Sequence, residues 1–325
     1  MSIEVLKAGI SDSIQDAGRY GYQHLGINPT GVMDLWAMRV ANTLVGNPAE
    51  TAVLEMTFPA ARLKFHISAL IALAGADFQP TVNGHPVNSL QPLLVPAGAV
   101  LEFTSCKKGS FVYLAVGGGF RLQDWLGSYS THTLVRRGGL NGAILQKGDM
   151  LPVNRTINHV EKFRKLPFRA HADDFYPEGA IKCLTVEESS KVSEATLEQF
   201  TSEKFYIHPQ SNRMGYRLTS ANPLSAPPAD ELSDVVTFGT IQLLPNGELM
   251  ALMADHQTTG GYPPIARLAM AFRSAFVQRR PGESIEFEWT DIDEAQRLYV
   301  TQVRALQQLE TSCRYHLKHF LHEAN

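Results

Sequence analysis

Polar side chains, two adjacent glycines and a proline follow directly after an apolar run at residues 253–263, which read MADHQTTGGYP. Adjacent glycines can bring bare backbone N–H groups close to a ligand, which is what an anion or oxyanion site requires. The candidate catalytic residues in this stretch are Asp255, Gln257, Thr259, Gly260 and Gly261, and the candidate substrate-binding residues are Thr258 and Tyr262. The alternative is an elaborate hairpin whose side chains satisfy its own backbone.

A second polar cluster, SNRMGYR at residues 211–217, places two arginines four residues apart around a glycine. Two guanidinium groups could bind a carboxylate or a phosphate. The substrate-binding candidates of this cluster are Arg213, Tyr216 and Arg217. Positions 213 and 217 would share one face of a strand, so an arginine of the pair could instead balance a structural acid.

A third group of polar residues and glycines lies near the N-terminus, at residues 13–22. Asp16 and Arg19 are further substrate-binding candidates, and an ordinary local ion pair between them is the alternative. Residues 126–131 carry several hydroxyl groups without a base that the sequence identifies, and no G-x-S-x-G elbow is present. His256 lies inside the glycine-rich stretch, where it could equally face water. No HExxH motif indicates a metal site.

Most of the remaining sequence consists of short apolar runs separated by Gly, Pro and Asn, which predict short strands that would position these residues. This pattern favours barrels or sandwiches over a doubly wound sheet. The expected strands are 70–76, 111–116, 205–207, 216–218, 240–244 and 249–253, with others beginning near 148 and 181. Hairpin turns are expected at 82–85 and 245–248. Gly117, Gly118 and Gly119 follow a strand without the spacing of a dinucleotide loop, so we expect a bend there.

Three helices are expected among these strands. Asp34 can cap a helix over 35–45 that Gly46 and Pro48 end, and a second helix has its apolar spacing over 189–200. The third covers 290–322 and begins at Thr290 or Asp291. The fold class predicted is mainly β with some α.

At 325 residues the chain is long enough for two ordinary domains. Residues 154–178 change from basic to acidic and lack periodicity, which predicts domains at 1–155 and 181–325 joined by a linker over 156–180. A net charge of −3 gives no basic surplus that would indicate nucleic acid or an anionic membrane as partner. Signal-peptide and membrane-spanning patterns are missing, and the three cysteines lack metal spacing, so we expect a cytoplasmic protein.

Several long strings resemble one family, among them QDAGRYGYQHLGINPTGVMD, LGSYSTHTLVRRGGLNGAILQKGDMLP, SNRMGYRL and GTIQLLPNGELMALMADHQTTGGYPPIA. This is the family of the 5-oxoprolinase C subunit, also called biotin-dependent carboxyltransferase or allophanate hydrolase subunit 2, which includes the antagonist of a kinase inhibitor. The resemblance runs from about residue 3 to 294. It implies two cyclophilin-like β-barrel domains with a cleft between them, followed by the C-terminal helix.

The resemblance also implies partners and cofactors. The B and A subunits of 5-oxoprolinase would complete an ATP-dependent enzyme that hydrolyses 5-oxo-L-proline to L-glutamate, with ATP handled by the complex. The alternatives are the carboxyltransferase subunit of a biotin-dependent urea or amide carboxylase, with biotin on another chain, and a non-catalytic regulatory antagonist of a kinase inhibitor. The family's Pro-Gly-Pro element after a strand is missing at residues 184–188, which read LTVEE.

Overall fold

The computed structural model describes residues 1–157, 160–187, 189, 192–227 and 233–323. Glu188, the last residue of the 184–188 departure, and residues 158–159 of the expected linker lie outside this range. The chain forms two compact units. Unit 1 contains residues 1–19, 30–172 and the stretch from residue 304 onward, and unit 2 contains residues 20–29 and 173–303.

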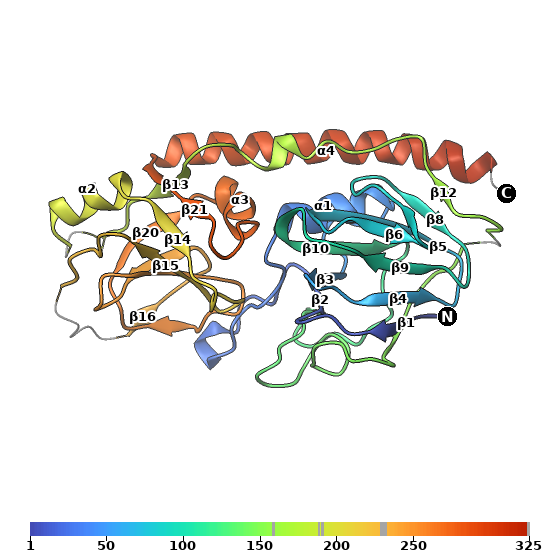
Figure 1. Cartoon of the computed structure of the whole chain (residues 1–325), viewed down its shortest axis with the longest axis horizontal. Helices are drawn as coiled ribbons and strands as arrows, with labels where there is room; N and C mark the ends of the chain where they lie inside the picture. The colour runs from blue at the N-terminus through green and yellow to red at the C-terminus, as the bar shows by residue number, and fades with distance from the viewer. Residues whose placement is uncertain (158–159, 188, 190–191, 228–232, 324–325) are drawn as a thin grey trace. The chain divides into compact units, whose positions relative to one another are not determined.

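Unit 1 is built on two six-stranded antiparallel sheets (Figure 1). The first has the order β11 (Met150–Pro152), β1 (Ser2–Lys7), β4 (Arg62–Phe65), β9 (Val100–Phe103), β6 (Pro80–Val82) and β7 (His85–Pro86). The second has the order β12 (Arg164–Lys165), β8 (Leu93–Val95), β5 (Ala69–Asp77), β10 (Lys108–Val116), β3 (Val53–Thr57) and β2 (Ser13–Gln15). Aliphatic side chains of both sheets, such as Leu63 and Leu114, form one buried core.

Helix α1 (Leu35–Leu44) follows the expected start and packs on β5 and β10. The Asp34 side chain caps it by accepting a hydrogen bond from the Ala37 N–H at 3.0 Å. The Asn83–Gly84 turn joins β6 to β7, and both residues have positive φ, as this type of hairpin turn requires. Gly118 and Gly119 also have positive φ and turn the chain at the end of β10, so the expected bend is confirmed.

Unit 2 contains an eight-stranded sheet that curls into a nearly closed barrel. Its order is β21 (Ser284–Ile285), β14 (Phe205–Ile207), β15 (Gly215–Ser220), β18 (Leu249–Leu252), β17 (Thr240–Leu243), β20 (Pro264–Leu268), β13 (Ile181–Leu184) and β22 (Phe287–Trp289). The two edge strands, β21 and β22, are separated in sequence only by Glu286, so the two edges of the sheet must lie close together. A separate small sheet pairs β16 (Asp234–Val235) with β19 (Thr259–Gly260).

The helices of unit 2 differ from the prediction in the bounds of the helix expected over 189–200 and in a short helix over 273–277 that was not expected. Helix α2 is Glu194–Ser202 rather than 189–200, because the Ser193 hydroxyl caps it by accepting from the Thr196 N–H. Short η1 (Gln23–Leu25), η2 (Asp173–Phe175), η4 (Met270–Phe272) and α3 (Arg273–Val277) complete the unit. The long α4 (Ile292–Glu323) begins as expected, since the Asp291 carboxylate accepts from the Glu294 N–H at 2.7 Å.

Part of the segment expected as a linker is structured. Residues 164–165 form β12, which pairs with β8, and the Ala170 N–H donates to the Leu90 carbonyl at 2.8 Å. Backbone pairing of this kind does not require a periodic sequence, so the composition of 154–178 did not indicate it. Residues up to 172 therefore belong to unit 1.

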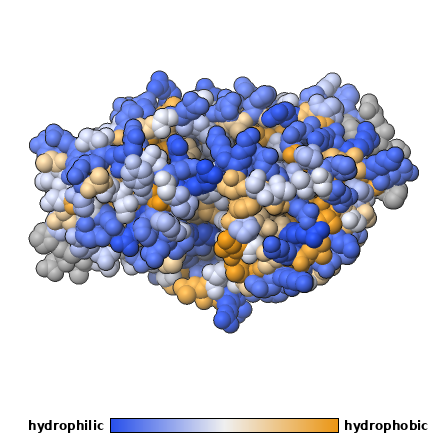
Figure 2. Space-filling view, viewed as in Figure 1, coloured by the Kyte–Doolittle hydropathy of each residue, from blue (hydrophilic) through white to orange (hydrophobic). Residues whose placement is uncertain are grey.

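Hydrophilic side chains predominate on the face shown in Figure 2, with apolar side chains scattered among them. Within the described residues, no helix combines the length and the apolar character needed to cross a bilayer.

Candidate functional site

The pairing of β15 with β18 brings two of the three polar segments together. These strands run antiparallel with Gly215 opposite Leu252, so the residues before β15 lie beside the residues after β18. The ladder continues past the strand ends, because the Met253 N–H donates to the Met214 carbonyl at 3.0 Å and the Asp255 N–H donates to the Arg213 carbonyl at 2.8 Å. The 211–217 segment and the 253–263 loop therefore meet at one end of the barrel.

Arg213 and Asp255 form a two-pronged ion pair in this position. Nε of Arg213 donates to Oδ2 of Asp255 at 2.8 Å, and Nη2 donates to Oδ1 at 2.9 Å. Both side chains are largely buried, which strengthens such a pair relative to a surface one. Because both carboxylate oxygens are occupied, Asp255 is arranged to hold the loop.

Arg217 lies in β15 and has a different partner, since its Nε donates to the Glu248 carboxylate. Tyr216 is buried, and its hydroxyl donates to the Val277 carbonyl at 2.8 Å while its ring packs on Phe276. The Tyr216 hydroxyl is thus satisfied within unit 2, whereas Arg217 uses only its Nε for Glu248. Each arginine of the 211–217 segment is therefore paired with a carboxylate, Arg213 with Asp255 and Arg217 with Glu248.

The glycine pair is shaped by a glutamine from the neighbouring strand. Gln242 of β17 is buried, and its Nε2 donates to the Tyr262 carbonyl at 2.9 Å. A Cβ atom at Gly260 would lie 2.5 Å from that nitrogen, so only glycine fits there without displacing Gln242. Within the part of the chain that the structure describes, the N–H of Gly261 has no protein acceptor. Tyr262 and Thr259 are exposed beside it.

His256 is the residue of this loop that the sequence did not single out. It is buried, and its Nδ1 lies 2.5 Å from the Gln257 carbonyl, which can only accept, so Nδ1 carries the proton. Burial lowers the pKa of His256. The hydrogen bond to Gln257 and the charge of Asp255 oppose this shift, and the positive charge of Arg273 adds a smaller lowering effect. The imidazole is therefore neutral at pH 7, and its Nε2 is a proton acceptor.

Asp16 organises a separate cluster in unit 1. Its carboxylate accepts from the Ser128 and Ser130 hydroxyls at 2.7 and 2.6 Å, from the Tyr129 N–H at 2.6 Å and from the Gly18 N–H at 2.8 Å. The hydroxyl-rich residues 126–131 are thus tied to an acid far away in the sequence. The ion pair with Arg19 is not among these contacts.

Arg19 is fully buried in the same cluster. Its Nη1 donates to the Thr30 hydroxyl at 2.6 Å, its Nη2 donates to the Ser130 carbonyl, and its Cζ lies 4.7 Å from the centre of the Trp125 ring. Asp16 and Arg19 belong to unit 1, whereas the other site candidates belong to unit 2.

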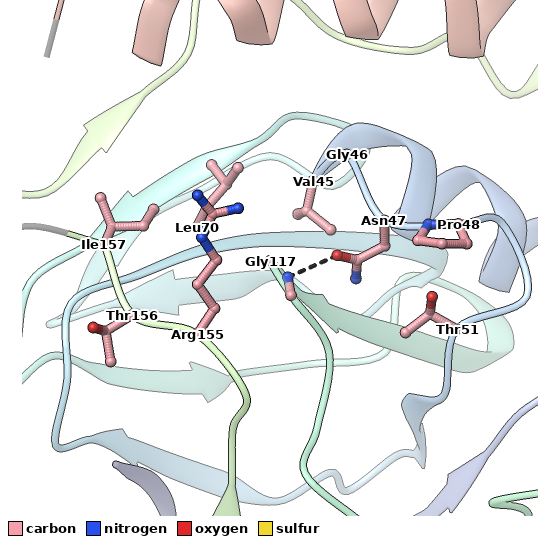
Figure 3. Close-up of a pocket in the computed structure, with 11 residues that line it drawn as sticks. Val45, Gly46, Asn47, Pro48, Thr51, Leu70, Gly117, Arg155, Thr156 and Ile157 are labelled. Atoms are coloured by element: carbon pink, nitrogen blue, oxygen red, sulfur yellow. Dashed lines mark hydrogen bonds between the residues drawn. The ribbon is translucent and has the colours of Figure 1, made fainter. Parts of the chain in front are cut away.

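A cavity of about 320 Å³ lies elsewhere in unit 1, between the turn after α1, the glycine bend after β10 and residues 155–157 (Figure 3). The N–H groups of its bend are already used: Gly117 donates to the Leu70 carbonyl and Gly118 to the Asn47 side chain. None of the predicted site residues lines it.

Comparison with known proteins identifies the family. Residues 25–289 match the family described as carboxyltransferase domain, subdomain A and B. The chain belongs to this carboxyltransferase domain family. The matched range contains the 211–217 segment and the 253–263 loop, and it ends within β22, before α4 begins.

Carboxyltransferase domain relatives include bacterial and yeast proteins. The chain is 32% identical to the 5-oxoprolinase C subunit of Haemophilus influenzae over 94% of this chain and 98% of that protein. It is 32% identical to the 5-oxoprolinase C subunit of Escherichia coli over 94% of this chain and 97% of that protein. It is 30% identical to urea amidolyase of Saccharomyces cerevisiae over 95% of this chain, but only 18% of that protein.

Solved structures show the same carboxyltransferase domain fold. The K. lactis urea amidolyase matches with a TM-score of 0.83 and 29% identity, covering 95% of this chain and 20% of that chain. The Kluyveromyces lactis urea carboxylase matches with the same TM-score and identity, covering 29% of its chain. The mainly β fold with a C-terminal helix is therefore confirmed.

Proposed function

We propose that this chain is the C subunit of a multi-subunit, ATP-dependent 5-oxoprolinase that hydrolyses 5-oxo-L-proline to L-glutamate. The observation that carries this proposal is the match to the bacterial 5-oxoprolinase C subunits over nearly the whole of both proteins. The urea amidolyase match is similar in identity, but it spans less than a fifth of that protein. The B and A subunits of 5-oxoprolinase are the proposed partners.

The 253–263 loop supports a role at the lactam. Opening a lactam places negative charge on the amide oxygen, which preorganised N–H donors stabilise. In our proposal the N–H groups of Thr259 and Gly261 supply these donors, while Gln257, Thr258 and Tyr262 contact the substrate. Gly260 shapes the loop, because its N–H belongs to the pairing of β19 with β16. The neutral His256 accepts a proton at Nε2 from the attacking water.

The remaining candidates hold this loop in place. Arg213 fixes the Asp255 carboxylate, and Tyr216 anchors β15 beneath them. We assign Asp16 and Arg19 the corresponding positioning role in unit 1, because hydrogen bonds within that unit occupy the Asp16 carboxylate and the Arg19 terminal nitrogens. Arg217 binds Glu248 through Nε alone, so it is the arginine of this segment that keeps nitrogens for substrate contact.

ATP is assigned to the partner subunits in this proposal. The chain has no G-x-x-x-x-G-K-[S/T] loop of the kind that cradles phosphates. A biotin cofactor would likewise have to reach the site on another polypeptide, because no lysine stands in a Met-Lys-Met context.

The test is turnover by the reconstituted three-subunit complex, measured as glutamate released from 5-oxo-L-proline with ATP. We expect activity with the wild-type chain and a loss of roughly hundredfold with Asp255→Asn, since the loop donors lose their orientation. Asp293→Asn, a change of an exposed aspartate on α4, serves as the matched control and keeps full activity. Equal turnover by the two variants would remove Asp255 from the site.

The carboxyltransferase function is the second candidate, favoured by the family match and by the yeast relatives. It requires bicarbonate and a biotinylated partner. Inhibition of the reconstituted reaction by avidin would support the carboxyltransferase function. Glutamate formation that avidin does not inhibit would support the hydrolase function. Tight binding of the B subunit without turnover under either condition would indicate a regulatory antagonist.

A further inference from the structure

Arg273, at the start of α3, differs from Arg213 and Arg217 in having no carboxylate beside it among the described residues. Its Cζ lies 5.3 Å from the centre of the Phe238 ring. A Cβ atom at Gly239 would come within 3.1 Å of its Nε, so the glycine leaves room for the guanidinium. Its Nε is buried, and Arg273 has no hydrogen-bond acceptor or ion-pair partner among the described residues.

A desolvated guanidinium without an acceptor is costly, so native structures rarely contain one. Arg213 and Arg217 show the usual arrangement, since each is bound to a carboxylate. Burial lowers the pKa of Arg273 to about 10, which still leaves the group charged at pH 7. The residue as a whole is half-buried.

Backbone contacts place this cation beside the loop. The Gly239 N–H donates to the Leu252 carbonyl at the end of β18, and the Leu268 N–H at the end of β20 donates to the Gly239 carbonyl, both at 2.8 Å. The 253–263 loop leaves from Leu252. Arg273 is close enough to this loop for its charge to act on His256.

The charges around Arg273 leave an excess of positive potential. The neighbouring cation Arg267 repels it, and Tyr20 and Tyr299 are the other ionisable side chains that act on it. Asp255 is the carboxylate that acts on His256, and Arg213 already binds both of its oxygens. Arg273 is therefore left available for an anion brought by a ligand.

We propose that Arg273 binds the carboxylate of the substrate, next to the N–H groups of the 253–263 loop that receive its amide oxygen. This inference rests on the proposed function and adds to it, because each arginine of the 211–217 segment is already paired with an acid. A guanidinium binds a carboxylate with two parallel hydrogen bonds, which fixes the orientation of a small ring compound. The site therefore selects amides that carry a carboxylate.

The test measures binding to the full chain by calorimetry and follows the His256 imidazole by NMR. The probes are L-5-oxoproline and 2-pyrrolidinone, the same lactam without the carboxylate. We expect L-5-oxoproline to bind roughly tenfold to a hundredfold more tightly, because a charge-assisted pair is lost in the other compound. We also expect it to raise the pKa of His256, since the bound anion offsets the charge of Arg273.

In Arg273→Gln, we expect neither the tighter binding of L-5-oxoproline nor the rise in the pKa of His256. Arg273→Lys keeps the positive charge but not the two parallel N–H donors, so its preference for L-5-oxoproline should be reduced. Arg297→Gln, at an exposed arginine of α4, is the matched control and keeps the preference. The proposal is overturned if Arg273→Gln retains the preference, if the wild-type chain shows none, or if inorganic phosphate binds more tightly than L-5-oxoproline. Should Arg273→Gln not fold, an unreduced preference in Arg273→Lys decides against it.

Failure of the proposed function is a separate result. The chain could prefer the carboxylate compound through Arg273 while its reconstituted complex releases no glutamate. That result would support the anion site and contradict the proposed hydrolase function. If a complex carrying Arg273→Gln releases glutamate with an unchanged KM, the proposed hydrolase function stands. The proposal that Arg273 binds the substrate carboxylate is then wrong.

Discussion

At the scale of the residue, hydrogen-bond and ion-pair partners decide which polar side chains can act on a ligand. Asp255 and Arg213 form two hydrogen bonds with each other, and the Asp16 carboxylate accepts hydrogen bonds from the 128–130 loop. His256 is different, because its Nδ1–H is used by the Gln257 carbonyl and its Nε2 remains an acceptor. Judged by residue type alone, the aspartates would have been the first candidates for contact with a ligand.

His256 should titrate below its ordinary value of 6.5, because burial opposes the charged form. A group whose pKa is lower in the folded state binds fewer protons there than in the unfolded state, so folding stability falls as pH drops below about 6.5. NMR titration of the imidazole checks that the pKa is lowered.

In the reconstituted complex, His256→Gln should lower kcat by roughly a hundredfold or more and remove the acidic limb from the pH profile of kcat. A titration midpoint above 6.5 would contradict the assignment.

At the scale of the element, the 253–263 loop is held between β15, β17 and the small β16–β19 sheet. Its shape depends on Gly260, where Gln242 occupies the space that a side chain would need. Loops of this kind tolerate substitutions poorly when the space is already filled by a buried, hydrogen-bonded side chain.

Gly260→Ala should therefore reduce turnover of the complex by about tenfold or more while changing stability by only about 1–2 kcal/mol, because the contact is with the end of one side chain. Gln242→Ala relieves that contact. The double variant should accordingly lose less activity than the sum of the two single losses, which a double-mutant cycle measures. Additive losses would show that Gln242 does not shape the loop.

The corresponding element in unit 1 is the 126–131 loop, which depends on Asp16. Asp16→Asn replaces a carboxylate with four hydrogen bonds by an amide that has one acceptor oxygen. We expect a loss of about 2–4 kcal/mol in the free energy of unfolding, measured by denaturant titration. Asp124→Asn is the control, since Asp124 is exposed and accepts one hydrogen bond at 3.3 Å. Similar losses for both variants would contradict the role of Asp16.

At the scale of the whole molecule, the chain passes between its two compact units more often than a simple two-domain division implies. Residues 20–29 belong to unit 2, although unit 1 surrounds them in sequence, and α4 contributes its first part to unit 2 and the rest to unit 1. Leu317 of α4 is buried close to Gly46 in unit 1. The part of α4 that follows residue 303 therefore packs on unit 1.

Thiol labelling checks this placement of the elements. Burial raises the pKa of the Cys183 thiol well above its ordinary value and that of Cys313, on α4, to about 12. Since the thiolate is the reactive form, we expect Cys106, which is half-buried, to react first in the native chain. Intact-mass measurement should find one modification under native conditions and three in denaturant. Modification of Cys313 at the rate of Cys106 would contradict the packing of α4.

The sequence by itself determined the longer apolar strands, the hairpin turn at 82–85, the starts of α1 and α4 and the motifs of the family, because these depend on local periodicity, turn residues and capping residues. The convergence of the 211–217 segment with the 253–263 loop also follows from two adjacent strands once their register is known. The tertiary structure alone decided which charges are neutralised. Glu248 lies 31 residues from Arg217, Ser130 lies 114 from Asp16 and Gln242 lies 18 from Gly260, and no local pattern predicts such contacts.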